Sequence, residues 1–395
     1  MRVTHVITRL IVGGAQENTI ATVLGLRAWP EFEVELIAGP TDGPEGSLEP
    51  LVRAVPGVFT PVPALIRAVH PLQDWRAYGA LRRRFRERRP DVVHTHSGKA
   101  GILGRLAAHA AGVPIILHTI HGPSFGPFQG PIPNGVFRTA ERLAARVTTH
   151  FVVVAQAMAD QYLAAGIGGP DRYTRIVSGF PLAPYLEASA DPAFRTRLGL
   201  APEDIVVGKI ARLFQLKGHD DLIGAAPRLV AAVPRLKFLL VGDGAWRARL
   251  EERVRCLGLT THFVFTGLVP PEAIPRYVGA MDVLVHLSRR EGLARALPQA
   301  LAAAKPVVAY DVDGAGEVCV EGETGFLVPP GDVGALERRI VQLARDPELR
   351  RRLGQRGQDL VREQFPVERM VRELAALYRR LASAQGRTSA GLART

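Results

Sequence analysis

Residues 283–310 read VLVHLSRREGLARALPQALAAAKPVVAY. Two short apolar runs in this stretch, Val283–Leu287 and Val307–Tyr310, have the composition of strands buried on both faces. Between them, Arg295–Ala304 has the composition of a helix. Strand, loop, helix, turn and strand in this order predict a parallel βαβ unit.

The same alternation extends along most of the chain. Further strands are predicted at Val3–Thr8, Glu33–Ala38, Val92–Thr95, Ile115–Thr119, Phe151–Val154, Val206–Ala211, Lys237–Val241 and Val264–Thr266. Helices are predicted at Trp75–Arg89, Gly101–Ala111, Ala157–Ala165, Asp221–Ala232, Ala245–Leu257 and Val333–Arg345. Because the alternation stops at a proline-rich stretch and then restarts, we predict an α/β protein with two Rossmann-like, doubly wound domains facing a cleft.

The domain boundaries follow from this restart. The first domain is predicted at residues 1–180 and the second at residues 205–366, with a linker at 181–204. The closing segment, 367–395, combines a predicted helix over Val367–Ala384 with a frayed tail.

Composition narrows the class of protein and its partners. Lys and Arg outnumber Asp and Glu by 50 to 38, and both halves of the chain share the excess. A nucleic-acid domain would concentrate that charge, so nucleic acid is not expected as a partner. Two cysteines, Cys256 and Cys319, are too few for a disulfide framework and indicate a reducing compartment. We expect a cytoplasmic protein, because the N-terminal residues do not resemble a signal peptide and no run reaches the roughly 18 apolar residues of a membrane span.

One basic run, Arg82–Arg89, leaves two interpretations open. It is either a solvated helix face or a contact for anionic lipid headgroups, at about 1 kcal/mol per basic residue near the surface. The second interpretation would attach the protein peripherally to the inner face of the cell membrane.

Two runs at predicted strand ends have the chemistry of a phosphate site. Gly13 and Gly14 follow the first strand, where glycines let the backbone approach a ligand at a helix N-terminus. Arg212 and Lys217 follow the strand Val206–Ala211, where a guanidinium fork and a point charge would converge on a diphosphate. A tight turn and two solvated loop charges are the alternatives.

A third run combines a carboxylate with free backbone donors. Backbone N–H groups over Gly292, Leu293 and Ala294 would receive a phosphate at a helix start. Glu291 would then face an uncharged polar group such as a sugar hydroxyl, and Gln299, about two helical turns further on, would share its face. The alternative for Glu291 is a carboxylate that only stabilises the helix start.

Histidines end two predicted strands, His94 and His96 after one, His118 and His121 after the next. The spacing of the first pair places both rings on one side of a strand, which permits a metal site, but contact with a bound ligand fits better because no acidic ligand stands at metal spacing. Asp311 and Asp313 form an Asp-x-Asp pattern that we interpret as a turn and helix cap.

Taken together, these runs resemble the retaining glycosyltransferases of family 4, which have the GT-B fold. The resemblance covers most of the chain and is carried by five runs. They are Gly-Gly-Ala-Gln at 13–16, His-Gly at 121–122, Arg212 with Lys217-Gly218, Glu291-Gly292, and Glu317 with the run 325–332.

The resemblance implies a role for each matched residue. Arg212 and Lys217 match the pair that binds the donor diphosphate, and Glu291 and His121 match residues beside the transferred sugar. It also implies donor contacts at Gly14, Leu268 and Val269. With the positions reasoned from the runs themselves, the full set of further donor-binding candidates is Gly13, Gly14, Leu268, Val269, Gly292, Leu293, Ala294 and Gln299. The resemblance also implies that the closing helix crosses back to the first domain, and that no metal is needed.

One departure concerns the family's second glutamate, which is Gln299 here. A Gln carbonyl accepts hydrogen bonds without charge, so a weaker hold on the ribose of the donor is expected. The expected activity is metal-independent, retaining transfer of a sugar from a nucleoside-diphosphate sugar, with UDP or GDP, to a glycan or lipid-linked acceptor. A sugar-nucleotide epimerase or hydrolase, and a noncatalytic sugar-nucleotide-binding protein, are the alternatives.

Overall fold

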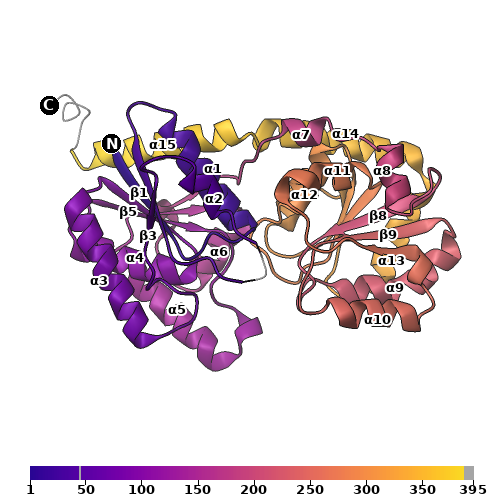
Figure 1. The fold of residues 1–395 in the computed structure, drawn as a ribbon, viewed down its shortest axis with the longest axis horizontal. Helices are drawn as coiled ribbons and strands as arrows, with labels where there is room; N and C mark the ends of the chain where they lie inside the picture. The colour runs from indigo at the N-terminus through magenta and orange to yellow at the C-terminus, as the bar shows by residue number, and fades with distance from the viewer. Residues whose placement is uncertain (44–45, 387–395) are drawn as a thin grey trace. The chain divides into compact units, whose positions relative to one another are not determined.

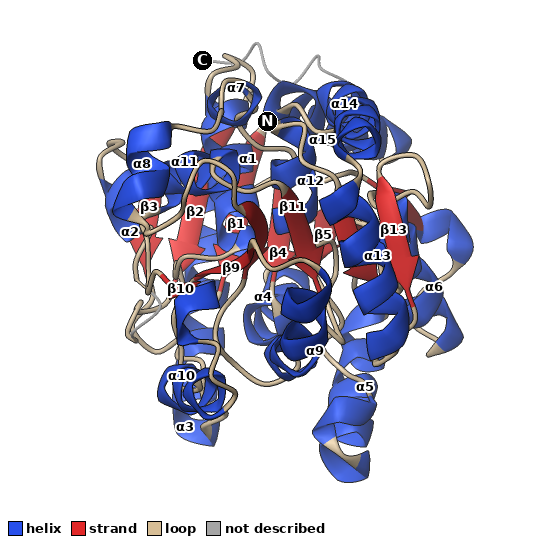
Figure 2. Ribbon diagram, turned by 90° about the vertical axis from the view of Figure 1, so that its right-hand side faces the viewer, coloured by secondary structure: helices blue, strands red, loops and turns tan. Residues whose placement is uncertain are grey.

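The computed structural model describes residues 1–43 and 46–386. They form two compact units, each a parallel sheet with helices packed against it (Figures 1 and 2). Unit 1 comprises Met1–Phe180 together with the segment that begins at Val367, and unit 2 comprises Pro181–Pro366. Unit 1 is therefore discontinuous in sequence.

The sheet of unit 1 has seven parallel strands within the described residues, in the order β3-β2-β1-β4-β5-β6-β7. Their bounds are β1 (Arg2–Ile7), β2 (Glu33–Ala38), β3 (Phe59–Pro61), β4 (Val92–His96), β5 (Ile115–Ile120), β6 (His150–Val153) and β7 (Tyr173–Arg175). The strand order reverses between β1 and β4, which makes this border a topological switch point.

The described helices of unit 1 pack against both faces of its sheet. They are α1 (Gly14–Arg27), α2 (Glu49–Arg53), α3 (Pro71–Arg88), α4 (Gly98–Ala110), α5 (Pro131–Ala145), α6 (Gln156–Ala164) and α15 (Val367–Ala384). Helices α1 and α15 bury apolar side chains against one set of strand residues, such as Val3, and α3 and α4 bury theirs against the alternate set, such as Val6. Figure 1 shows α15, in yellow, running beside α1.

Unit 2 repeats this plan with six parallel strands among the described residues, in the order β10-β9-β8-β11-β12-β13. The strands are β8 (Ile205–Ile210), β9 (Leu236–Val241), β10 (Phe263–Phe265), β11 (Val283–His286), β12 (Val307–Tyr310) and β13 (Gly325–Val328). The helices are α7 (Ala183–Leu186), α8 (Pro192–Arg197), α9 (His219–Ala232), α10 (Arg247–Cys256), α11 (Ile274–Gly279), α12 (Ala296–Ala302), α13 (Val333–Arg345) and α14 (Pro347–Gln364). Helices α9, α10 and α13 share the main core, and α12 packs on α14.

Two details differ from expectation. Residues 181–204, expected to form a linker, carry α7 and α8 and group with unit 2. Helix α12 is shorter than the predicted Arg295–Ala304, because the chain beyond it turns through Ala304 in the left-handed conformation, with φ at 53°.

Within the described part of the chain, none of the helices is long and apolar enough to cross a membrane.

Candidate functional site

Two central strands of unit 2, β8 and β11, lie side by side although the chain visits two other strands between them. The strand order reverses here, and open parallel sheets bind ligands beyond the carboxyl ends of strands at such a point. The loop after β8 carries Arg212 and Lys217, and the loop after β11 carries Ser288 and Glu291. The candidate site of unit 2 is the pair of loops at this switch point.

The Lys217 ammonium and the Glu291 carboxylate form an ion pair across these two loops. The same carboxylate oxygen, Oε1, accepts a hydrogen bond from Ser288 Oγ at 2.8 Å and lies 3.7 Å from His286 Nε2. Burial raises the pKa of the Glu291 carboxyl. Lys217, His286 and the hydrogen bonds from Lys217 and Ser288 together lower it by more, so the pKa lies below its usual value. Glu291 is therefore held ionised and oriented at neutral pH.

Backbone contacts fix the two loops to each other. The N–H of Arg289 donates to the carbonyl of Leu216 at 2.8 Å. Gly218 has φ at 67°, and a Cβ there would lie 2.1 Å from the carbonyl oxygen of Leu287. Position 218 therefore requires glycine for two reasons. The backbone there is left-handed, and the end of β11 approaches it closely.

Asp313 supports the Glu291 loop from the neighbouring strand connection. Its carboxylate accepts from the backbone N–H of Glu291 at 2.6 Å, and the N–H of Gly314 donates to the carbonyl of Gly292 at 3.1 Å. The interpretation of Asp313 as a helix cap is therefore wrong. Its carboxylate binds the Glu291 loop, and the short helical turn that follows Gly314 has no side-chain cap.

Arg212 occupies a more exposed position in the same loop. Its guanidinium carbon lies 5.9 Å from the ring centre of the half-exposed Phe214, and its backbone carbonyl accepts from His219 Nε2 at 3.0 Å. The structure thus joins Lys217 to Glu291 directly and places Arg212 at the rim of the loop.

A third loop of unit 2, which follows β9, contains two glycines that sequence reasoning missed. A Cβ on Gly242 would lie 2.3 Å from the carbonyl oxygen of Ala211, and one on Gly244 would lie 2.4 Å from that of Leu213. The N–H of Gly242 also donates to the carbonyl of Gly267 at 3.2 Å, just before Leu268 and Val269. The Gly-Asp-Gly spacing after a predicted strand was the signal that could have found this loop.

The predicted phosphate receiver, Gly292 to Ala294, lies in a bend before α12 and not in its first turn. Gln299 lies inside α12, is buried, and its amide Nε2 donates to the hydroxyl of Tyr185 at 2.8 Å. Glu291 and Gln299 therefore do not share a helix face, because Glu291 precedes the helix.

Lys209, on β8, is a further buried cation that sequence reasoning missed. It is 1% exposed, and among the described residues its amine has no hydrogen-bond partner. Burial and the charge of Lys217 lower its pKa to about 7, against the opposing effects of Glu291 and Asp221. Burying an amine without a hydrogen-bond partner lowers the stability of the fold, so this residue is a candidate for a functional role.

In unit 1, the candidate residues again gather at the switch point. Gly13 is extended and precedes α1, which begins at Gly14. A hollow of about 410 Å³ opens beside this turn, between the loops that follow β1 and β4. It is lined by Thr8, Arg9, Gln16, Arg67, Val69, Asp74, Ser97, Gly98, Lys99, Ile102, Leu103 and Phe137. Lys99 forms an ion pair with Asp74 at its wall.

The four candidate histidines separate into different environments. His121 is half-buried just after β5, and its Nε2 lies 3.0 Å from His96 Nδ1. His94 is buried between hydroxyls, and His118 is buried on the other face, 2.9 Å from Thr95 Oγ1. Ligand contact through His94 or His118, which we expected, is therefore wrong, because both rings lie inside the protein.

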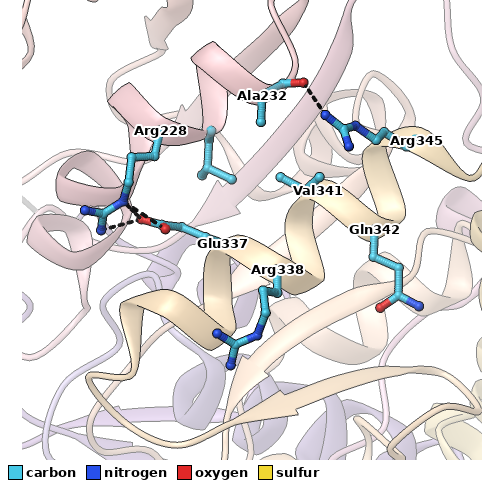
Figure 3. Close-up of a pocket in the computed structure, with 8 residues that line it drawn as sticks. Arg228, Ala232, Glu337, Arg338, Val341, Gln342 and Arg345 are labelled. Carbon is cyan, nitrogen blue, oxygen red and sulfur yellow. Dashed lines mark hydrogen bonds and ion pairs between the residues drawn. The ribbon is translucent and has the colours of Figure 1, made fainter.

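A second hollow, of about 440 Å³, lies between α9 and α13 (Figure 3). Arg228 forms an ion pair with Glu337 at its edge, and Arg345 donates to the carbonyl of Ala232 at 2.8 Å. This hollow lies along helices and not at strand ends, so it does not compete with the switch-point loops as a phosphate site.

Both halves of the chain have counterparts in known proteins. Residues 13–179 match the glycosyl transferase 4-like domain, and residues 191–360 match the glycosyl transferases group 1 family. The putative glycosyltransferase EpsD of Bacillus subtilis is 31% identical over 314 residues, which are 78% of this chain and 81% of EpsD. A UDP-Gal:alpha-D-GlcNAc-diphosphoundecaprenol alpha-1,3-galactosyltransferase of Escherichia coli is 26% identical over 88% of this chain and 89% of its own length.

Solved structures agree on the fold. HepE of Anabaena, crystallised with UDP, superposes with a TM-score of 0.79 at 23% identity, over 95% of this chain and 99% of HepE. Fold and matches together define a glycosyltransferase with the GT-B fold. More particularly, the chain belongs to family 4 of the glycosyltransferases, as its sequence runs indicated.

Proposed function

We propose that the protein transfers a sugar from a nucleoside-diphosphate sugar to a glycan or lipid-linked acceptor, with retention at the anomeric carbon and without a metal. The observation that carries this proposal is the Lys217–Glu291 pair at the switch point of unit 2. One loop supplies a cation for the leaving diphosphate, and the adjoining loop supplies an oriented carboxylate for the sugar.

Charge develops on the diphosphate as the glycosidic bond breaks. Lys217, Arg212 and the backbone N–H groups near Gly292 would stabilise that charge more in the transition state than in the ground state. These cations take the place that a metal has in other transferases. Such stabilisation requires that these groups be held in place before the reaction. The backbone contacts between the loops after β8 and β11 hold them in this way.

Glu291 is a positioning carboxylate in this mechanism and not a nucleophile. Its oxygen Oε1 accepts hydrogen bonds from Lys217 and Ser288, which fixes the orientation of the carboxylate. Retention would then follow from attack on the face that the diphosphate leaves, with a phosphate oxygen as base. Among donors, UDP is favoured, because the galactosyltransferase relative is named for UDP-Gal.

The acceptor is proposed to bind unit 1 in the hollow beside β1 and β4. Arg67 and Lys99 at this hollow, with the apolar Ile102 and Phe137, suit an acceptor that joins a phosphoryl group to apolar or sugar groups. The lipid-linked diphosphate acceptor named for the galactosyltransferase relative has this chemistry.

Peripheral contact with an anionic membrane surface is proposed for α3. Val69, Leu72 and Trp75 are 76%, 51% and 69% exposed at its start. Within the basic run, Arg84 binds the buried Glu35, so its charge serves the fold, whereas Arg83 and Arg86 are exposed. Binding to phosphatidylglycerol vesicles, lost in Trp75→Ala with Arg86→Ala, tests this contact without disturbing Arg84.

The proposed donor site is tested by thermal unfolding with UDP, GDP and ADP in the presence of a chelator. A ligand at 100 times its dissociation constant should stabilise the protein by about 2.7 kcal/mol. Lys217→Ala should abolish the shift, and Arg228→Ala, which removes an exposed ion pair outside the site, should keep it. No shift with any nucleotide, or a shift only with added Mg²⁺, would contradict the metal-independent donor site.

The reaction itself is tested by product analysis with the UDP-sugar that binds. Transfer with the anomeric configuration of the donor kept supports the proposal. Full-rate release of free sugar without acceptor would instead indicate a hydrolase or epimerase, and binding without turnover a noncatalytic protein.

A further inference from the structure

Lys209 on β8 is a buried residue of unit 2 that the donor mechanism leaves unused. Alternate residues of a strand share one face of the sheet, so Lys209 lies on the same face as Val207, whose side chain belongs to the main core. Its amine is buried and, among the described residues, has no hydrogen-bond partner. An apolar side chain of similar length would fill this space at a lower cost in free energy, so the amine itself needs an explanation.

Two histidines near this amine also have a ring nitrogen without a partner. His219 begins α9, and its Nε2 donates to the backbone carbonyl of Arg212 at 3.0 Å, which leaves a lone pair on Nδ1. His286 ends β11, and its Nε2 lies 3.7 Å from Glu291 Oε1, too far for a hydrogen bond. Within the described chain, β8, β11 and α9 therefore each contribute a buried polar nitrogen that the fold does not use.

Three charged side chains act on the buried amine. Lys217 and Glu291 come from the loops after β8 and β11, and Asp221 comes from the first turn of α9. Glu291 is paired with Lys217, and Asp221 Oδ2 accepts from the guanidinium of Arg289 and from the hydroxyl of Tyr310, both at 2.8 Å. Each carboxylate thus already has a cation of its own, and neither is left over for an ammonium at this place.

Burial keeps the amine mostly neutral above pH 7. Burial and the charge of Lys217 lower the pKa of Lys209 to about 7, and burial lowers the pKa of His219 and of His286 to about 3. At pH 8 both rings are therefore neutral, and only about a tenth of the amine is protonated. Lys209 is thus a group whose charge can change near physiological pH, whereas the two rings stay neutral.

A diphosphate changes this balance. A nucleoside diphosphate at Lys217 brings at least two negative charges to the loops after β8 and β11, and a nearby negative charge favours the protonated form of an amine. The same anion offsets the charge of Lys217, which is one of the two causes that keep the amine neutral. Both effects act in the same direction, so the amine should take up a proton from the solvent.

We propose that Lys209 is a positioning residue of the donor site, which takes up one proton when a nucleoside diphosphate binds at Lys217 and so places a buried ammonium near the Lys217–Glu291 pair. This inference rests on the proposed function, because it takes the diphosphate to bind at Lys217. Lys217 must then serve both the diphosphate and Glu291, and the new ammonium supplies a second positive charge that stabilises the ionised Glu291 carboxylate. The proton comes from the solvent and stays on the amine.

Proton uptake is tested by calorimetric titration of the full-length protein with UDP at pH 8, in buffers that differ in ionisation enthalpy. The slope of the observed enthalpy against the ionisation enthalpy gives the number of protons taken up. We expect between about one half and one proton per UDP. The terminal phosphate of UDP does not contribute to this uptake, because it is already ionised at pH 8 and is held by cations.

Lys209→Met keeps the length of the side chain and removes the amine. It should still bind UDP, and its proton uptake should fall to near zero. Lys237→Met on β9 is the matched control, because it removes a partly exposed lysine whose amine donates to the carbonyl of Thr261 at 2.8 Å. Its uptake should equal that of the wild type. Equal uptake in Lys209→Met and in the wild type would place the proton on another group and overturn the inference.

The pH dependence of binding gives a second readout, which a purely structural role of Lys209 would not move. Because a proton is taken up, the dissociation constant of UDP should rise about four- to tenfold between pH 7 and pH 8.5. Below pH 7 the amine is already protonated in the free protein, so this dependence should fade there. Lys209→Met should give a flat profile from pH 7 to pH 8.5, and a wild-type profile as flat as that of the variant would contradict the inference.

The outcomes separate this inference from the proposed function. UDP binding without a difference in proton uptake between the wild type and Lys209→Met overturns the role of Lys209 and leaves the donor site standing. Absence of binding of UDP, GDP and ADP contradicts the donor site and overturns this inference with it. Binding of UDP with an uptake that is lost in Lys209→Met and kept in Lys237→Met supports both.

Discussion

Lys209 links the buried electrostatics of unit 2 to pH. Its pKa of about 7 in the folded protein lies below the usual 10.5, so between these values the unfolded chain binds the proton that the folded protein has released. Stability therefore rises with pH across this window, and below about pH 7 the full cost of a buried ammonium applies. We expect the urea midpoint of the wild type to rise between pH 7 and pH 10.

Replacing the amine tests this relation. Lys209→Met should be more stable than the wild type by a few kcal/mol at pH 6.5, and the difference should shrink as the pH rises toward 10. The charges that face Lys209 are those of Lys217, Glu291 and Asp221, which remain in the variant. A constant difference at all pH values would show that Lys209 acts through packing and not through its charge.

Gln299 offers a second test at the scale of one side chain. Its amide donates to Tyr185, a bond that the family's glutamate can make only with the hydroxyl as donor. If Gln299 also serves the ribose, Gln299→Glu should tighten UDP binding several-fold, because charge-assisted hydrogen bonds are roughly twice as strong as neutral ones.

Tyr185→Phe is the matched control for this substitution. It removes the buried partner of Gln299, so it should cost about 1 kcal/mol of stability and leave the UDP dissociation constant unchanged. Calorimetric titration with UDP measures both variants. Unchanged or weaker binding in Gln299→Glu would confine Gln299 to a structural role in α12.

At the scale of the element, the loop between β8 and α9 depends on Gly218. Gly218→Ala places a Cβ 2.1 Å from the carbonyl oxygen of Leu287 on a backbone with φ at 67°. We expect a loss of about 1–3 kcal/mol in stability. UDP binding should weaken at least tenfold, since the displaced loop carries Lys217.

The same helix supplies the control. Gly224 lies inside α9, where an added Cβ would meet Arg253 at an ordinary 3.5 Å. Gly224→Ala should therefore stabilise the protein by about 0.5–1 kcal/mol through helix propensity, with UDP binding intact. If Gly218→Ala also binds UDP normally, the close approach of β11 is not needed for the site.

How far the sequence predicts these elements depends on their burial. Central strands such as β8 and β11 are continuous apolar runs between turn residues, and they were predicted close to their observed bounds. The strands β3 and β7 were missed, because three residues at the edge of a sheet, partly solvated, carry little apolar pattern. Helix α13 was predicted over its observed range, since a polar cap at Asp332 precedes it.

The candidate site was predictable to a similar depth. Lys217 and Glu291 could be placed at strand ends, and neighbouring parallel strands bring such ends together. Lys209 was missed because its burial depends on what α9 covers. The hydrogen bonds that join the rings of His5, His96 and His121 were missed because they require the register of neighbouring strands. That register pairs His5 with His94 and His96 with Thr119.

At the scale of the molecule, each unit has its own apolar core, and the core of unit 1 needs both ends of the chain. Met370, Leu374 and Tyr378 of α15 are buried with Ile20 and Val23 of α1, although hundreds of residues separate them in sequence. Unit 1 can therefore complete its core only after the whole of unit 2 has been synthesised. We therefore expect a substitution in one core to destabilise every segment of that unit, including segments far away in the sequence, and to leave the other unit unaffected.

Leu374→Ala tests that division. Removing a buried leucine side chain should cost about 2–5 kcal/mol. Hydrogen exchange should then accelerate in peptides of residues 1–180, which precede the substitution by nearly half the chain, and not in residues 205–345. Leu343→Ala, in the core of unit 2, is the mirror control and should accelerate only the second set. Faster exchange confined to the neighbourhood of residue 374 would show that α15 detaches alone, and that the core of unit 1 stands without it.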